Sequence, residues 1–224
     1  MDTTPIQLTT WNVQKGLQFG WEKQLKKALD ASSLCLLQEM PYHSRHLELF
    51  QQQEFHFAPG AKAPRVQTGV LTAAHTNALK QRTLKHPEPW IRYPKATLIT
   101  EYPLSQSGLT LWVANIHGIN FTIGTRAFAQ QLHDIAAALK SHSGPMIIAG
   151  DFNSWNPKRN KAITQALFHL GLHEVSFDPH HLKKVFGHPL DRVFYRGLSL
   201  QHHTVIPVTC SDHNMLQAQF LVST

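Results

Sequence analysis

Near its beginning the chain has a short run in which apolar side chains alternate with threonine and glutamine. This run, residues 6–11, has the two-residue period of a strand and is followed by Asn12. A second run, residues 33–38, is apolar without alternation, which predicts a strand buried on both faces, and it meets Glu39. Both predicted strands therefore end at an amide or an acid.

The same pattern is clearest at residues 145–156, around which the rest of the chain is arranged. Residues 146–149 are all apolar and predict another doubly covered strand, after which Gly150 gives the backbone freedom to turn. Asp151 and Asn153 are two positions apart, so in an extended segment they point the same way. Ligands of α/β folds bind beyond the carboxyl ends of strands, which makes this pair the first candidate site.

Periodicity assigns most of the remaining chain. The turns and prolines of residues 58–67, with Lys62 and Arg65, predict a loop, and residues 79–92 predict an irregular excursion. His43 and His46 are expected at the surface. Further strands are predicted at residues 69–74, 96–102, 109–116, 190–195, 198–208 and 215–222, and helices at residues 21–29, 43–53, 125–140 and 163–170.

Polar side chains recur wherever a predicted strand meets a loop. They are Asn12, Glu39, His117, Asp151, Asn153, Asp191, Asp212 and His213. A sheet would gather these dispersed residues on one rim. Simpler roles are open for four of them: Asn12 and Asn153 as caps, Asp191 as a partner of Arg192, and His117 as a core histidine.

The chemistry of this set favours a hard cation. Glu39, Asp212 and the Asn12 amide offer only oxygen, which suits Mg²⁺ or Mn²⁺ rather than zinc. Clustered carboxylates repel one another unless a cation lies between them. The sequence therefore predicts one of these ions as a cofactor.

Length and composition narrow the class of protein. The 224 residues contain no repeat or linker, which predicts one domain over residues 1–224. Lys and Arg outnumber Asp and Glu by 21 to 14, so the formal charge of +7 favours a polyanionic partner, although the protein could simply be basic. Two cysteines are too few for a disulfide framework. No stretch is typical of a signal peptide or a membrane span, so we expect a cytoplasmic monomer without stable membrane insertion.

Five short motifs match a known family in order and spacing. They are Thr-Trp-Asn at 10–12, Leu-Gln-Glu at 37–39, Asn-Ile-His at 115–117, Gly-Asp-Phe-Asn at 150–153 and Ser-Asp-His at 211–213. In these motifs the chain resembles the endonuclease/exonuclease/phosphatase superfamily along essentially its whole length. Residues 113–121, 187–198 and 211–214 are similar to its bacterial YafD-like branch.

The resemblance implies a fold and a reaction. The fold would be an α/β four-layer sandwich, with two mixed β-sheets packed face to face and flanked by helices. The reaction would be divalent-metal-dependent hydrolysis of a phosphoester. Glu39 would hold the metal, with Asn12 and Asp212 nearby.

The remaining motif residues would act on water and phosphate. By the resemblance, Asp151 would orient or deprotonate the attacking water and Asn153 would hold a phosphate oxygen. His213, fixed by Asp191, would contact the phosphate, and His117 would bind phosphate or assist the leaving group.

The sequence narrows the substrate only in part. Glu39 is followed by Met40 and Pro41 where apurinic endonucleases carry Thr-Lys, which argues against abasic-site cleavage. The basic charge favours a nuclease or phosphodiesterase acting on nucleic acid or nucleotides. The alternatives are a phosphatase or phospholipase C-type enzyme on phospholipid or inositol phosphate, and a scaffold that kept the fold without activity.

Overall fold

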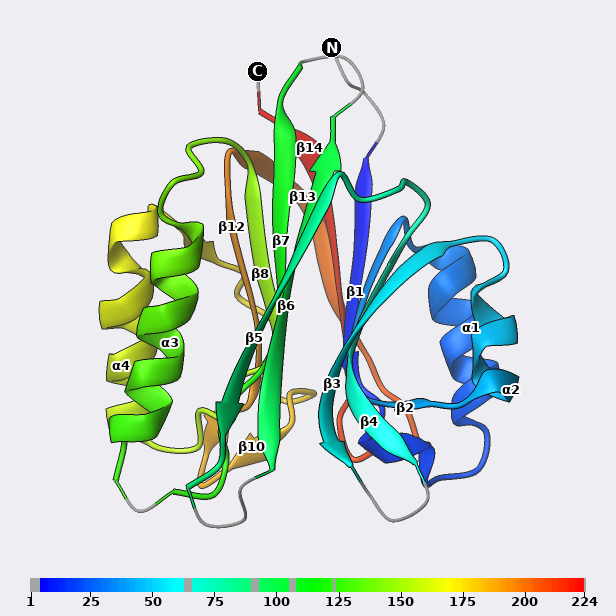
Figure 1. Cartoon of the computed structure of the whole chain (residues 1–224), viewed down its shortest axis with the longest axis horizontal. Helices are drawn as coiled ribbons and strands as arrows, with labels where there is room; N and C mark the ends of the chain where they lie inside the picture. Colours follow the sequence, from blue (N-terminus) through cyan, green and yellow to red (C-terminus); the bar gives the residue numbers. More distant parts are fainter. Residues whose placement is uncertain (1–4, 63–65, 90–92, 105–107, 123, 224) are drawn as a thin grey trace.

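The computed structural model describes residues 5–62, 66–89, 93–104, 108–122 and 124–223. Its long strands form two six-stranded sheets. Figure 1 shows the sheets facing each other, with helices on both outer sides. The expected four-layer α/β sandwich of two mixed sheets flanked by helices is therefore confirmed.

The first sheet has the strand order β13-β14-β1-β2-β4-β3. β1 and β2 are parallel, and the other neighbours are antiparallel. The strands are β1 (Ile6–Asn12), β2 (Leu34–Tyr42), β3 (Glu54–Lys62), β4 (Gln67–Ala74), β13 (Leu198–Ile206) and β14 (Met215–Val222).

The second sheet has the order β5-β6-β7-β8-β12-β9, with β7 and β8 parallel. Its strands are β5 (Lys80–Pro87), β6 (Pro94–Pro103), β7 (Thr110–His117), β8 (Met146–Asp151), β9 (His173–Glu174) and β12 (Asp191–Arg196). A small hairpin of β10 (Lys184–Val185) and β11 (His188–Pro189) lies at the end of the sandwich opposite the start of β1 (Figure 1).

Helices cover the outer face of each sheet. α1 (Trp21–Ala31) and α2 (Ser44–Leu47) lie on the first sheet, and α3 (Arg126–Leu139) and α4 (Pro157–Leu167) lie on the second (Figure 1). Short 3₁₀ turns are η1 (Gln14–Gly16), η2 (Glu48–Phe50) and η3 (Phe168–Leu170). Across the described ranges, none of the helices is both long and apolar enough to cross a bilayer.

Apolar side chains fill three layers, one between the sheets and one under each pair of helices. In β8, Ile147 and Ala149 join the core between the sheets, whereas Met146 and Ile148 join the core under α3 and α4. This double burial is the reason that the strand shows no alternation. In α3, the apolar positions at spacings of four, three and four are buried as expected, including Phe128.

Two segments predicted to be irregular are edge strands. β3 occupies the first half of the predicted loop 58–67, and its pairing shifts register between Pro59 and Lys62. Proline and glycine are tolerated there because an edge strand pairs on one side only. Lys62 ends the strand, and Arg65 lies outside the described residues.

β5 occupies most of the predicted excursion 79–92 and pairs with β6 over its whole length. Nearly all of its side chains are exposed or half-buried, so the strand lacks the apolar stripe that would have predicted it. Its charged side chains are typical of a protected sheet edge. Residues 90–92 lie outside the described part of the chain.

The segment 43–53 forms only α2 and the short turn η2. Phe50 is buried as predicted. His46 is buried as well, with its ring edge-on to Trp21 at a centroid distance of 5.0 Å. The surface position expected for His46 is therefore wrong, because the ring fills the gap between α1 and β2 and its Nδ1 lies 3.3 Å from the Pro41 carbonyl oxygen.

Candidate active site

Strand pairing in the second sheet brings three candidate residues together. The parallel register of β7 and β8 sets His117 opposite Asp151. The antiparallel register of β12 and β8 sets Asp191 opposite the same residue. Three neighbouring strands thus deliver an imidazole and two carboxylates to one rim.

The first sheet delivers Asn12 and Glu39. Asn12 pairs with Gln38 across the parallel strands β1 and β2. Glu39 has a φ of 53° at a register shift between Leu37 and Met40, so it leaves the ladder as part of a bulge. The strand continues to Tyr42, and the prediction that it ends at Glu39 is wrong.

These residues meet in one cleft of about 480 Å³ at the rims of both sheets. Seven of the eight residues predicted from the sequence line it: Asn12, Glu39, His117, Asp151, Asn153, Asp212 and His213. Asp191 is buried behind His213, to which it is hydrogen-bonded. The dispersed strand ends therefore converge as the sequence predicted.

Asp151 is the buried centre of the cleft. Asn12 Nδ2 donates to its Oδ2 at 3.0 Å, and the backbone N–H of Asn153 donates to its Oδ1 at 2.9 Å. Burial raises the pKa of Asp151, an effect that the charge of His213 opposes and that of Asp191 increases. The carboxylate is therefore held in place and made more basic than an exposed aspartate.

Asn153 is held in a strained conformation beside Asp151. Its φ is 52°, which costs a non-glycine residue about 1–3 kcal/mol. Its side-chain Nδ2 donates to the Gly118 carbonyl at 3.0 Å and lies 3.3 Å from Asp151 Oδ2. The buried guanidinium of Arg159 donates to its backbone carbonyl at 3.0 Å. This is a positioned side chain and not a helix cap.

His213 and Asp191 form a buried pair with 2.7 Å between Nδ1 and Oδ2. Burial alone would lower the pKa of His213, but the charge and hydrogen bond of Asp191, with the charges of Asp151 and Asp212, raise it to about 9. Arg192, the alternative partner considered for Asp191, instead bonds Glu174 and Ser154. The imidazole is thus cationic at neutral pH.

His117 faces Lys95 on the neighbouring strand β6, with 2.7 Å between its Nε2 and Lys95 Nζ. Its Nε2 also lies 3.6 Å from Glu39 Oε1 and 3.8 Å from Asp151 Oδ2. Burial and the charge of Lys95 lower the pKa of His117 well below its ordinary value. The ring accepts a hydrogen bond from Lys95 through Nε2, so it has polar contacts within the cleft and is not enclosed in the apolar core.

Glu39 and Asp212 differ in their surroundings. In the described part of the chain neither oxygen of Glu39 accepts a hydrogen bond, and the nearest lysine is Lys15 at 4.0 Å. Burial, together with the charge of Asp151, raises the pKa of Glu39, although Lys95 and Lys15 act against this. Asp212 lies at the exposed edge and pairs with Lys183 at 3.1 Å.

The donor set fits a hard divalent cation bound through few protein ligands. Among the residues with described positions, no three His, Cys, Asp or Glu side chains form a ready metal-binding group. Mg²⁺, however, usually takes one or two carboxylates and completes its shell with water and phosphate. Glu39 supplies a carboxylate without hydrogen bonds, and the buried Oε1 of Gln14 in the same cleft has no partner among the described residues.

Four cations of this site were not predicted from the sequence, and one of them is the exposed Lys15 in the lining of the cleft. Lys95 and Lys183 line the cleft, and Arg159 is fully buried beneath it. The two lysines stand in segments without apolar period, so no local pattern distinguishes them from surface lysines. Arg159 lies on the buried face of α4, and a charged residue at such a position was a detectable signal.

Comparison with known proteins identifies the class to which this fold and cleft belong. The chain is a member of the endonuclease/exonuclease/phosphatase family, whose model matches residues 9–213. Its relatives include UPF0294 proteins of bacteria, which represent the YafD-like branch. The relative from Vibrio parahaemolyticus is 36% identical over 99% of this chain and 80% of that protein. The relative from Klebsiella pneumoniae is 37% identical over 96% of this chain and 82% of that protein.

Solved structures share the fold at low sequence identity. An endonuclease/exonuclease/phosphatase from Bacteroides vulgatus has a TM-score of 0.74 at 13% identity, covering 99% of this chain and 100% of that one. The human Nocturnin catalytic domain with bound sulfate has a TM-score of 0.72 at 18% identity, covering 98% and 95%. D. rerio TDP2 complexed with a single-strand DNA product has a TM-score of 0.68 at 17% identity, covering 98% and 100%.

Proposed function

We propose that this protein is a divalent-metal-dependent phosphodiesterase that cleaves nucleic acid or nucleotides. The observation that carries the proposal is the buried Asp151 carboxylate in the same cleft as the cationic His213–Asp191 pair. A base and a fixed positive charge are the two groups that hydrolysis of a phosphodiester requires.

Asp151 is the group that orients and deprotonates the attacking water. Its raised pKa makes it a better base, and its hydrogen bonds from Asn12 and Asn153 fix its position. Asn153 Nδ2 is the neutral donor for a phosphate oxygen, which takes the N–H that otherwise makes the long 3.3 Å bond to Asp151 Oδ2.

His213 is the charged donor for the phosphate. Because Asp191 accepts from its Nδ1, its Nε2–H is left to contact a phosphate oxygen on which negative charge accumulates. The Lys95–His117 pair, with 2.7 Å between Nζ and Nε2, carries the proton available to the leaving oxygen.

Glu39 is the residue that would hold a divalent cation, with the Asn12 and Gln14 amides close by and Asp212 at the rim. When bound, such an ion supplies charge neutralisation at the phosphate oxygens. The raised pKa of Glu39 supports this role, because a largely buried carboxylate that accepts no hydrogen bond among the described residues is stabilised by a cation.

The charge of the protein supports a polyanionic substrate. Lys15, Lys95 and Lys183 all line the cleft, in a chain whose formal charge is +7. Such a field raises the local concentration of anionic ligands. D. rerio TDP2, which shares this fold, was solved in complex with a single-strand DNA product, and this agrees with the proposed substrate class.

A second candidate is hydrolysis of a phospholipid head group. Large apolar side chains are exposed at the cleft mouth, namely Leu17 at 70%, Phe121 at 60% and Phe186 at 82% exposure. Exposed apolar residues around a polar cleft are compatible with contact to a lipid surface.

A panel of substrates with Mn²⁺ distinguishes the two candidates. We expect a single-stranded oligonucleotide to be cleaved to shorter oligonucleotides or mononucleotides. The cleavage should stop when a chelator is added. Release of soluble head groups from phospholipid vesicles, with the oligonucleotide left intact, would establish the second candidate. No product from either substrate class would contradict the proposed function.

A further inference from the structure

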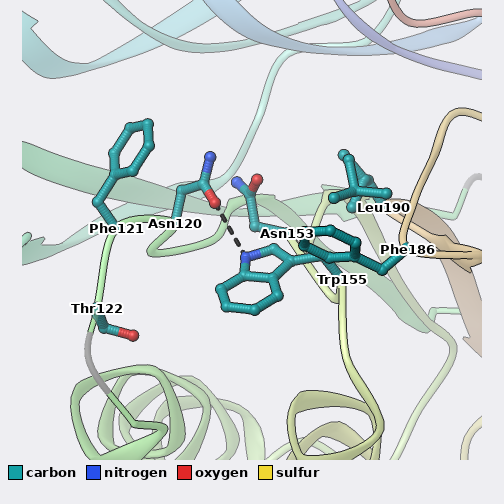
Figure 2. Close-up of a pocket in the computed structure, with 8 residues that line it drawn as sticks. Asn120, Phe121, Thr122, Asn153, Trp155, Phe186 and Leu190 are labelled. Carbon is teal, nitrogen blue, oxygen red and sulfur yellow. Dashed lines mark hydrogen bonds between the residues drawn. The ribbon is translucent and has the colours of Figure 1, made fainter.

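An apolar pocket adjoins the catalytic cleft. It has a volume of about 560 Å³ and shares Asn120, Phe121, Asn153, Val185 and Leu190 with the lining of the cleft. In Figure 2 the amide side chains of Asn120 and Asn153 lie between Phe121 on one side and Trp155 with Phe186 on the other. A molecule whose phosphate is held at Asn153 can therefore extend into this pocket.

Trp155 is a rigid wall of the pocket. Its Nε1 donates to Asn120 Oδ1 at 3.1 Å, as the dashed line in Figure 2 shows. The Arg159 guanidinium lies 4.6 Å from the centroid of the Trp155 ring and covers one of its faces. Arg159 also donates to the carbonyls of Ile119, Asn120 and Asn153, so the pocket and the catalytic Asn153 share one buried anchor.

Phe186 lies at the tip of the β10–β11 hairpin, in a turn whose backbone conformation is unfavourable for phenylalanine. Val185 pairs with His188, so the loop consists of Phe186 and Gly187, with φ values of 50° and 80°. Positive φ at both positions defines a type I′ turn, where asparagine or aspartate followed by glycine is preferred. A phenylalanine that is 82% exposed gains little from burial that could offset this strain.

The strain and exposure of Phe186 therefore have no structural reason within the chain. Its ring lies 6.2 Å from that of Trp155 at an angle of 67°. The two rings form a corner that offers a flat group one face to stack on and one edge to meet.

We propose that this pocket binds the nucleobase of the nucleotide next to the scissile phosphate, stacked against Trp155 and Phe186. The inference rests on the proposed function and names the part of the substrate that the pocket takes. A base fits better than an acyl chain because the walls are rigid aromatic planes and the Asn120 amide supplies a hydrogen-bonding group beside them.

The variant Phe186→Asn tests the inference without disturbing the hairpin. Asparagine suits the type I′ turn, so we expect the melting temperature to stay the same or rise. Loss of the ring should lower kcat/KM about tenfold or more for an oligonucleotide that carries a base beside the cleaved bond. The loss should be much smaller for the same oligonucleotide with a base-free spacer at that position. Phe168→Ala, an exposed ring that lines neither the cleft nor the pocket, is the matched control.

A binding measurement in chelator separates this inference from the proposed function. We expect a 5′-mononucleotide to bind the wild type about tenfold more tightly than deoxyribose 5-phosphate, and Phe186→Asn to remove that difference. Equal binding of the two probes, or faster cleavage of the base-free oligonucleotide by the wild type, would overturn the inference. Base-dependent binding without cleavage of any oligonucleotide would keep the pocket and overturn the proposed function. Weaker binding of phospholipid vesicles by Phe186→Asn, without base-dependent binding, would assign the pocket to lipid.

Discussion

Among the described residues, five non-glycine side chains stand on backbone with positive φ, and all five line the cleft or the pocket beside it. They are Gln14, Lys15, Glu39, Asn153 and Phe186. Each such position costs about 1–3 kcal/mol, and the surrounding structure must hold it in place. Their confinement to one region indicates that positioning of these side chains has been favoured over local stability.

Replacing Asn153 with glycine tests whether a strained position is kept for its side chain, because glycine removes the side chain but retains the backbone conformation. In Asn153→Gly we expect a higher melting temperature than in Asn153→Ala, because both lose the side-chain hydrogen bonds but only glycine adopts a φ of 52° without strain. Turnover should fall about a hundredfold, since one positioned donor is lost. Steady-state kinetics with thermal melting would check both, and Asn153→Ala should be the less stable variant. A Gly variant that keeps full turnover would contradict the role of the amide.

His213 gives a prediction with a defined pH range. Its pKa of about 9 lies above the ordinary value of 6.5, so its pair with Asp191 stabilises the fold fully below pH 6.5. That stabilisation is lost as the pH rises through about 9. In chelator, the free energy of unfolding of the wild type should therefore exceed that of Asp191→Asn most at pH 6 and least at pH 10. An unchanged NMR titration of His213 in Asp191→Asn would contradict this account.

Among the secondary-structure elements, periodicity located the buried strands and the edge strand β13 but failed at two other sheet edges, β3 and β5. The strands that carry Asn12, His117 and Asp151 were predictable because each is covered on both sides or alternates cleanly. β3 and β5 were not, since these two edge strands have neither a continuous apolar run nor a strict alternation. The bulge at Glu39 depends on pairing with β4, which no local pattern encodes.

The candidate site was predictable from the sequence only in part. Its acids, amides and histidines end strands and match ordered motifs, and the structure brings them to one cleft. Lys95 reaches the cleft from the start of β6, and the apolar pocket needs the β10–β11 hairpin to meet Trp155. Both depend on how distant elements pack, so sequence patterns could not show them.

A buried polar network links the two sheets behind the cleft. Gln38 Nε2 donates to Asn115 Oδ1 at 2.8 Å and to Thr10 Oγ1 at 3.1 Å, and Asn115 Nδ2 donates to the Leu71 carbonyl at 2.9 Å. Both amides are fully buried. The network fixes how the rim of one sheet lies against the rim of the other.

The two amides of this network should contribute to stability together, so that the double replacement costs less free energy of unfolding than the two single replacements added. Asn115→Leu removes the acceptor of the shortest hydrogen bond of Gln38 and the side-chain donor to the Leu71 carbonyl, so we expect a loss of about 1–3 kcal/mol in the free energy of unfolding. The double variant Gln38→Leu with Asn115→Leu should lose less than the sum of the single losses. Urea denaturation of the four proteins measures this, and strictly additive losses would show that the two amides act independently.

At the scale of the whole molecule, the two sheets form one site only by packing face to face. Asn12 from the first sheet bonds Asp151 from the second, and His213, which precedes β14, bonds Asp191 on β12. Binding at this junction should therefore stabilise the whole fold. At a Mg²⁺ or Mn²⁺ concentration of 100 times Kd the gain is about 2.7 kcal/mol, or on the order of 5–10 °C in Tm.

Glu39→Gln should abolish this gain in Tm while leaving the metal-free protein at least as stable, because the raised pKa of Glu39 marks an unfavourable buried charge. The exposed Glu54→Gln variant serves as the control and should respond to the ion like the wild type. A gain in Tm that persists in Glu39→Gln would place the ion elsewhere.

The role of Asp151 is tested most directly by the rate at which the protein cleaves a single-stranded oligonucleotide in the presence of Mn²⁺. The rate is measured for the wild type, for Asp151→Asn and for the exposed control Asp30→Asn. We expect cleavage by the wild type and by Asp30→Asn, and a rate lower by a hundredfold or more for a folded Asp151→Asn. Equal rates for the wild type and Asp151→Asn would show that this cleft does not perform the hydrolysis.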